Sequence, residues 1–155
     1  MPSKEEKLRV LAKMAGAFRQ QNLIWAVGAS LLLYLKGYVD DFNDIDIMVA
    51  DTDAVKMENI LKTMGSLQPS TRDIYETKHF SEFIIDGVDV DMMGGFAIVR
   101  DGKVYDCDLN PSQITQSVEL NGQKIPLHSV ALWRTYYALM GRDQKVAIID
   151  KKGIE

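Results

Sequence analysis

Two aspartates, Asp44 and Asp46, separated by one apolar residue form the pattern with the clearest chemical meaning in this chain. Ile45 and Ile47 alternate with them, which predicts a half-buried strand on which residues i and i+2 share a face. Two carboxylates on one face repel each other unless a cation lies between them. Oxygen ligands favour a hard cation such as Mg²⁺, which is usually shared with substrate phosphates. The pair therefore predicts a metal site that handles phosphate.

A candidate phosphate site, Gly28-Ala29-Ser30, is separated from Asp44 by thirteen residues. It follows the apolar run 23–27 and opens another over 31–35, a pattern that predicts a strand, a tight turn and the start of a helix. Backbone N–H groups at a helix start, together with the positive end of the helix dipole, bind phosphate. A phosphate turn so close to a metal pair indicates an enzyme that acts on phosphate groups.

A second acidic strand is predicted after the turn signal Asp86-Gly87, which is typical of a β-hairpin. The strand over 88–93 has Asp89 and Asp91 on one face. Either aspartate taken singly is also consistent with a solvent-facing hairpin strand. Together with the first pair, a third carboxylate would complete the geometry of two-metal phosphoryl transfer. One ion would bind a triphosphate, the other would lower the pKa of an attacking hydroxyl, and the third carboxylate would accept its proton.

Three motifs resemble the signature of the DNA polymerase β-like nucleotidyltransferase superfamily. They are Val27-Gly28-Ala29-Ser30, Asp44-Ile45-Asp46-Ile47 and Val90-Asp91-Met92. Within that superfamily, the small size and the segment 125–145 are similar to stand-alone antibiotic nucleotidyltransferases of the lincosamide and aminoglycoside types. The resemblance extends over residues 23–149. It implies a small mixed β-sheet with helices packed on one face and an active site on the exposed face.

The resemblance also implies roles for individual residues. Its metal ligands and catalytic carboxylates correspond to Asp44, Asp46 and Asp91, and its nucleotide-binding turn to Gly28, Ala29 and Ser30. Asp91 is preferred to Asp89, because the acidic residue of the family tends to lie several residues past the hairpin glycine. Asp89 stays an alternative, since it too has apolar neighbours. Ala29 departs from the usual glycine or serine, which leaves room for an enzyme of weakened activity.

Two cations near the C-terminus, Arg142 and Lys145, are further candidates for nucleotide binding. They begin a predicted helix after Gly141 and could reach a triphosphate. The alternative interpretation is that both are ordinary surface residues.

The predicted function is a Mg²⁺- or Mn²⁺-dependent nucleotidyltransferase that uses two-metal-ion catalysis. It would transfer a nucleoside monophosphate, AMP from ATP, to a hydroxyl of a small molecule or protein. The runner-up is a catalytically silent nucleotide-binding or protein-binding member, for example the partner of a toxin, and a third option is a metal-dependent phosphohydrolase. Stand-alone members often complete the acceptor site with a second subunit, so a homodimer is plausible. The sequence leaves the acceptor and the nucleotide open.

Composition limits the other classes of function. At 155 residues, with 46% hydrophobic and 26% charged residues, the chain is expected to be one domain over 1–155. A net charge of −4 argues against extended nucleic acid as a partner. The single Cys107 excludes an intramolecular disulfide and fits a reducing compartment. Without a signal peptide or a long apolar run, no membrane contact and a cytoplasmic location are expected.

The element pattern predicts an α+β or mixed α/β fold. Helices are expected over residues 3–21, 30–36, 132–140 and 142–149, and from a cap at 51–53 to residue 64. Strands are expected over 23–27, 45–50, 80–85 and 88–93, with a loop over 66–72. Asp101-Gly102 and Asn121-Gly122 predict two further hairpins.

Overall fold

The computed structural model describes residues 1–69 and 77–154. Its helices are α1 (Lys4–Phe18), α2 (Ala29–Leu35), α3 (Ala54–Met64), α4 (Val130–Leu139) and α5 (Asp143–Lys152). Its strands are β1 (Trp25–Val27), β2 (Ile45–Val49), β3 (Ser66–Gln68), β4 (His79–Ile85), β5 (Val88–Gly94), β6 (Ala97–Arg100), β7 (Lys103–Asp106), β8 (Gln116–Leu120) and β9 (Gln123–Leu127). The expected mixed α/β fold is confirmed.

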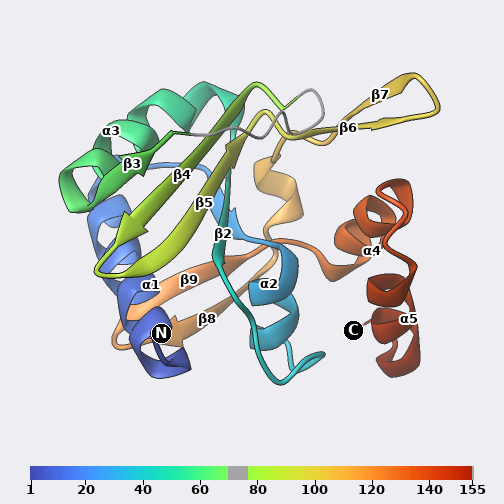
Figure 1. Ribbon diagram of the computed structural model, residues 1–155, viewed down its shortest axis with the longest axis horizontal. Helices are drawn as coiled ribbons and strands as arrows, with labels where there is room; N and C mark the ends of the chain where they lie inside the picture. The colour runs from blue at the N-terminus through green and yellow to red at the C-terminus, as the bar shows by residue number, and fades with distance from the viewer. Residues whose placement is uncertain (70–76, 155) are drawn as a thin grey trace.

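A mixed sheet forms the centre of the molecule, with strand order β3-β4-β5-β2-β1-β9-β8 (Figure 1). Strand β2 is parallel to β5 and antiparallel to β1, and β1 is parallel to β9. Strands β6 and β7 form a separate two-stranded hairpin. The motif strands β1, β2 and β5 are therefore direct neighbours in the middle of the sheet.

The three hairpins predicted from Asp-Gly and Asn-Gly pairs are confirmed. Asp86, Asp101 and Asn121 have φ of 50°, 52° and 49°, and the glycine after each also has a positive φ. Two successive residues at positive φ make the type I′ turn, whose twist matches that of paired strands. These turns join β4 to β5, β6 to β7 and β8 to β9.

The loop predicted over residues 66–72 is wrong in its first part. Ser66–Gln68 form β3, an edge strand antiparallel to β4, and residues 70–72 lie outside the described residues. A Cβ on Gly65 would lie 2.3 Å from the carbonyl oxygen of Ile84. Glycine at this position thus lets the chain leave α3 directly against β4. The strand was missed because three residues are too few for an alternation of polar and apolar side chains to give a sequence signal.

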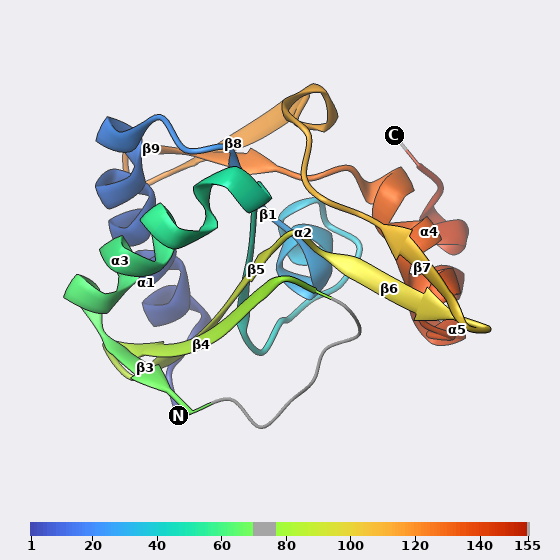
Figure 2. The same ribbon diagram turned by 90° about the horizontal axis from the view of Figure 1, so that it is seen from above.

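Helices α1 and α3 pack together on one face of the sheet (Figures 1 and 2). Helix α1 begins at the cap residue Ser3, whose hydroxyl accepts the N–H of Glu6, and buries Leu11, Met14 and Phe18 completely. The Ser81 hydroxyl of β4 donates to Glu58 of α3 at 3.0 Å. Because side chains alternate along a strand, the neighbours of Ser81 on β4 point to the opposite face.

The opposite face of the sheet looks toward α2, α4 and α5 (Figure 2). Helix α2 follows β1 directly, and α4 follows β9. Arg134 of α4 binds Asp150 of α5 through two hydrogen bonds, of 2.6 Å and 2.9 Å, which hold the two helices together. In the part of the chain that the structure describes, no helix is both long and apolar enough to cross a membrane.

Candidate active site

Strand register brings the predicted carboxylates together. Asp46 of β2 and Asp91 of β5 are directly opposite each other in neighbouring parallel strands. Opposite residues point to the same face of a sheet, here the face away from α1 and α3. Asp44 lies two residues before Asp46, just ahead of β2, and Asp91 is only 8% exposed. The acidic side chains therefore gather at the centre of one sheet face.

A cavity of about 560 Å³ lies over this face. The sequence-predicted residues that line it are Ala29, Ser30, Asp44, Asp46, Asp91, Arg142 and Lys145. They come from the start of α2, from β2 and the residue just ahead of it, from β5, and from the α4–α5 connection and α5. Residues more than a hundred positions apart in the sequence thus meet in one cavity, whose volume is typical of small-molecule sites.

Asp89, the alternative third carboxylate, lies elsewhere. It is exposed, pairs with Ile84 of β4 near the hairpin turn, and is not among the residues that line the cavity. Strand β2 begins at Ile45, which pairs with Val90, so Asp89 lies beyond the paired part of β2. Of the two candidates, the structure places Asp91 with Asp44 and Asp46.

The glycine turn is fixed by packing against α4. The N–H of Gly28 donates to the carbonyl oxygen of Asp46 at 3.1 Å, which places the turn beside the carboxylates. A Cβ on Gly28 would lie 2.6 Å from Cζ2 of Trp133, so the indole occupies the space that any side chain would need. Gly28 thus packs against Trp133, which lines the cavity, although Gly28 is not itself a lining residue.

Ala29 has a φ of 53°, in the left-handed region. This conformation costs a residue with a Cβ roughly 1–2 kcal/mol. The turn therefore retains the backbone shape that glycine adopts freely, at an energetic cost in this chain. Backbone strain of this kind gathers at ligand sites.

Helices α4 and α5 form the wall of the cavity that faces the carboxylates. The Arg142 guanidinium lies 5.9 Å from the centre of the Tyr137 ring, and the backbone N–H of Arg142 donates to the Tyr137 carbonyl at 2.8 Å. Burial raises the pKa of the Tyr137 hydroxyl, the negative charge of Asp46 raises it further, and Arg142 opposes this. Tyr137 thus interacts with both charges and stays neutral at ordinary pH.

Sequence reasoning assigned Trp133 to the core and left Phe96 unplaced, and it considered one of Tyr136 and Tyr137 as a lining residue of an acceptor pocket. Phe96 stacks on Trp133 with ring centres 5.8 Å apart, and Trp133 packs against Tyr137 at 5.4 Å. All three residues line the cavity, as does Phe80 of β4. The i, i+4 spacing of Trp133 and Tyr137 on one helix was the available signal. It does not reveal which face of the helix meets the site.

The donor set fits a hard cation that is shared with a ligand. The three aspartates offer only carboxylate oxygens, which suit Mg²⁺. Among the described residues, no group of three or more His, Cys, Asp or Glu side chains could hold an ion by itself. Mg²⁺ is commonly bound through one or two carboxylates, with water and substrate phosphates completing its coordination. The geometry is therefore compatible with an ion that binds together with a nucleotide.

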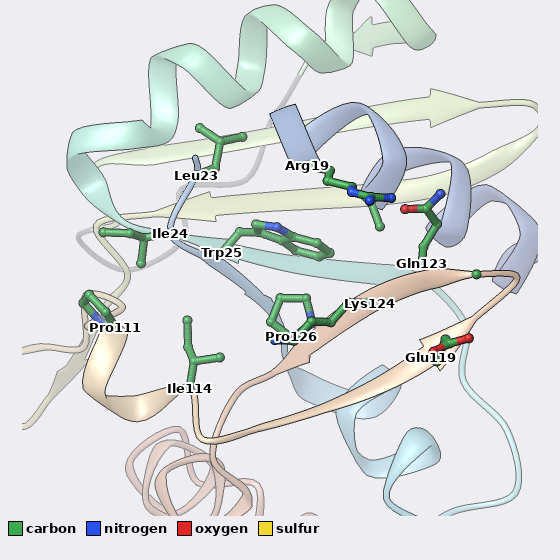
Figure 3. A pocket seen from close by; sticks show the side chains of 12 residues that line it. Arg19, Leu23, Ile24, Trp25, Pro111, Ile114, Glu119, Gln123, Lys124 and Pro126 are labelled. Carbon is green, nitrogen blue, oxygen red and sulfur yellow. The ribbon is translucent and has the colours of Figure 1, made fainter. Parts of the chain in front are cut away.

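A second cavity, of about 590 Å³, lies between the end of α1, the start of β1 and the β8–β9 hairpin (Figure 3). The paired register of β1 and β9 is limited to Val27 and Leu127, and Pro126 has no N–H to extend it. The two strands separate there, with Trp25 in the middle of the lining (Figure 3). No sequence-predicted site residue lines this cavity.

Comparison with known structures defines the class of protein as a nucleotidyltransferase. A candidate nucleotidyltransferase from Thermotoga maritima, known from its crystal structure, aligns with a TM-score of 0.74 and 30% identity, over 97% of this chain and 94% of that one. The antibiotic-resistance factor ANT(2'')-Ia, in complex with adenylyl-2''-tobramycin, aligns with a TM-score of 0.61 and 12% identity, over 94% and 89%. The lincosamide adenylyltransferase LnuA, bound to lincomycin, aligns with a TM-score of 0.55 and 16% identity, over 87% and 85%.

The sequence matches the aminoglycoside-2''-adenylyltransferase family over residues 10–152. The chain belongs to this family, and the predicted resemblance to small antibiotic nucleotidyltransferases is confirmed. No curated protein gives a significant match.

Proposed function

We propose that the protein transfers a nucleoside monophosphate, AMP from ATP, to a hydroxyl group of an acceptor molecule. The observation on which this depends is the pairing of Asp46 with Asp91 across neighbouring strands, in one cavity with Asp44 and Ser30. The family is named for adenylyl transfer, and ANT(2'')-Ia was solved with an adenylylated compound. Both support AMP as the transferred group.

In this proposal each part of the cavity has a separate task. The N–H groups at the start of α2 and the Ser30 hydroxyl bind the phosphates, assisted by Arg142 and Lys145. Two divalent ions, Mg²⁺ or Mn²⁺, would be held by Asp44, Asp46 and Asp91, and when bound supply positive charge for the triphosphate and the acceptor oxygen. The acceptor oxygen forms a bond to the α-phosphorus, and the bond to the departing pyrophosphate breaks. Asp91 accepts the hydroxyl proton.

Titration calorimetry with a non-hydrolysable ATP analogue tests the metal and nucleotide site. We expect the wild type to bind the analogue only when Mg²⁺ is present, and the Asp44→Ala/Asp46→Ala variant to lose most of this binding. Asp89→Asn, which removes a charge outside the cavity, is the matched control and should bind like the wild type. Equal binding by all three proteins, or none by the wild type, would refute the proposed site.

The silent-member alternative makes a different prediction for the same protein. A nucleotide-binding module would bind ATP and Mg²⁺ but transfer nothing to any acceptor. Incubation with labelled ATP and a panel of hydroxyl compounds, followed by mass spectrometry, separates the two. A phosphohydrolase would instead release inorganic phosphate from ATP.

A further inference from the structure

The second cavity combines an apolar lining with a polar end, and the proposed reaction gives it no role. Its volume of about 590 Å³ lies in the range of small-molecule sites. The end of α1, the start of β1 and the β8–β9 hairpin bound it on different sides (Figure 3). Because these elements surround the cavity, it suits a compact ligand better than an extended partner surface.

Apolar surface is open to the cavity over most of its lining. Leu23 and Ile24, just ahead of β1, and Ile114 and Pro126 line it, and all four are half-buried. Part of each side chain therefore stays accessible, and Figure 3 shows these residues on both sides of the nearly buried Trp25. A ligand that covers apolar surface gains roughly 25 cal/mol for each Å² removed from water.

Arg19 and Gln123 form the polar end of the cavity. Their side chains lie next to each other in Figure 3. A Cβ on Gly16 of α1 would lie 3.5 Å from Nε2 of Gln123, and Arg19 follows Gly16 by about one helical turn. In the described part of the chain, neither side chain has a hydrogen bond or an ion pair. Both therefore have N–H groups to donate to a ligand.

The charges of the lining leave one cation without an opposite charge. Glu119 and Lys124 are directly opposite each other on β8 and β9, so their charges offset each other across the hairpin. Arg19 is the remaining charged lining residue among those described. A guanidinium binds a carboxylate through two parallel hydrogen bonds. One positive charge at the end of an apolar lining thus suits a molecule with one anionic group and an apolar body.

We propose that the second cavity binds a small amphipathic carboxylate. Its anionic group would lie at Arg19 and Gln123, and its apolar body against Leu23, Ile24 and Ile114. None of the lining residues of this cavity also lines the candidate active site. The inference is therefore independent of the proposed nucleotidyl transfer.

NMR titration of the full chain with three matched compounds tests this site. Hydrocinnamate carries the anionic group and an apolar ring, hydrocinnamide has the same shape without the charge, and acetate lacks the apolar body. We expect hydrocinnamate to shift the indole signal of Trp25, which is assigned with Trp25→Phe. It should bind about threefold to tenfold more tightly than the amide, the effect of one exposed charge-assisted contact, and acetate should bind more weakly than hydrocinnamate. Equal binding of acid and amide, or no shift of the Trp25 signal, would overturn the proposal.

A pair of arginine variants locates the anionic group. Arg19→Gln removes the charge at the polar end, so it should bind hydrocinnamate no more tightly than the wild type binds the amide. Arg9→Gln removes the same charge from an exposed position of α1 outside the cavity, and should bind hydrocinnamate like the wild type. Equal effects of the two variants would contradict the proposal. The titrations contain no nucleotide, so failure of the proposed transfer reaction would leave their outcome unchanged.

Discussion

Two of the cavities in the described part of this protein have nearly the same volume, about 560 Å³ and 590 Å³, yet they differ in how they are built. The first lies where strands β2 and β5 stay in register and hold two carboxylates side by side. The second lies where β1 and β9 lose their register, and its one acidic lining residue is Glu119 among the residues described. Volume alone therefore does not identify the site. The register of the paired strands identifies the site, because it fixes the relative positions of charged side chains.

We expect the largest difference in stability and nucleotide binding when one glycine at each cavity is replaced by alanine. In Gly28→Ala the new Cβ would overlap Trp133, and overpacking of this kind costs about 1–3 kcal/mol. Gly122 lines the second cavity at a φ of 78°, and a Cβ at this position would meet nothing within 4 Å, so Gly122→Ala costs only backbone strain, about 1 kcal/mol. Urea unfolding measures both changes. We expect only Gly28→Ala to weaken binding of the ATP analogue, by at least tenfold, and the same loss in Gly122→Ala would break the comparison.

His128 links the two regions, and its titration gives the next largest effect. Its ring lies edge-on to that of Trp133 in the first cavity, with ring centres 6.2 Å apart, and its Nε2 lies 3.3 Å from Oε1 of Gln113, in the turn that begins with Pro111 of the second cavity. Burial lowers the pKa of His128 to about 4 from its usual 6.5. Between pH 4 and pH 6.5 the unfolded chain binds more protons at His128 than the folded chain does. The contribution of the neutral His128 to the free energy of unfolding is therefore complete above pH 6.5 and is lost as the pH falls toward 4.

Urea unfolding of the wild type at pH 7 and pH 5 checks this expectation. The contribution of His128 should fall by roughly 2 kcal/mol between the two values, at 1.36 kcal/mol for each pKa unit. His128→Gln lacks the titrating ring and should show correspondingly less loss. An identical pH dependence in both proteins would contradict the buried, neutral state of His128.

Tyr137 sharpens the comparison within the first cavity. Tyr137→Leu removes the ring beneath Arg142 and should weaken nucleotide binding about threefold to tenfold, because a cation–π contact is worth about 0.5–2 kcal/mol. Tyr137→Phe keeps the ring and should bind nucleotide nearly normally. Tyr136→Phe is the control, because Tyr136 is buried but does not line the cavity. Calorimetry that shows equal losses in Tyr137→Leu and Tyr137→Phe would assign the effect to the hydroxyl instead.

The first two motifs could be predicted because their signals are local. A strand of alternating Asp and Ile, and a glycine between a strand and a helix, have their geometry within a few residues. The choice between Asp89 and Asp91 could not be made with the same rule, since a period of two places both on one face. It is the position at which β2 begins, opposite Val90, that separates them.

The aromatic wall was beyond sequence reasoning for a different reason. Trp133 lies against Gly28 because α4 packs across the start of α2, a contact between segments about a hundred residues apart. Periodicity identifies an apolar helix face but not its partner. The same holds for Arg142, whose position depends on the turn at Gly141, with a φ of 74°, and on the ring of Tyr137.

The most direct test is the rate of AMP transfer in Asp91→Asn and Asp89→Asn, two isosteric changes on one strand. With an acceptor that the wild type modifies, we predict that Asp91→Asn lowers the rate at least 100-fold, since removal of a general base typically costs a factor of about 10²–10⁴. Asp89→Asn should stay within about twofold of the wild type, because its side chain lies outside the cavity. Equal rates for the two variants, or a larger loss in Asp89→Asn, would contradict the assignment of the site to the paired strands β2 and β5.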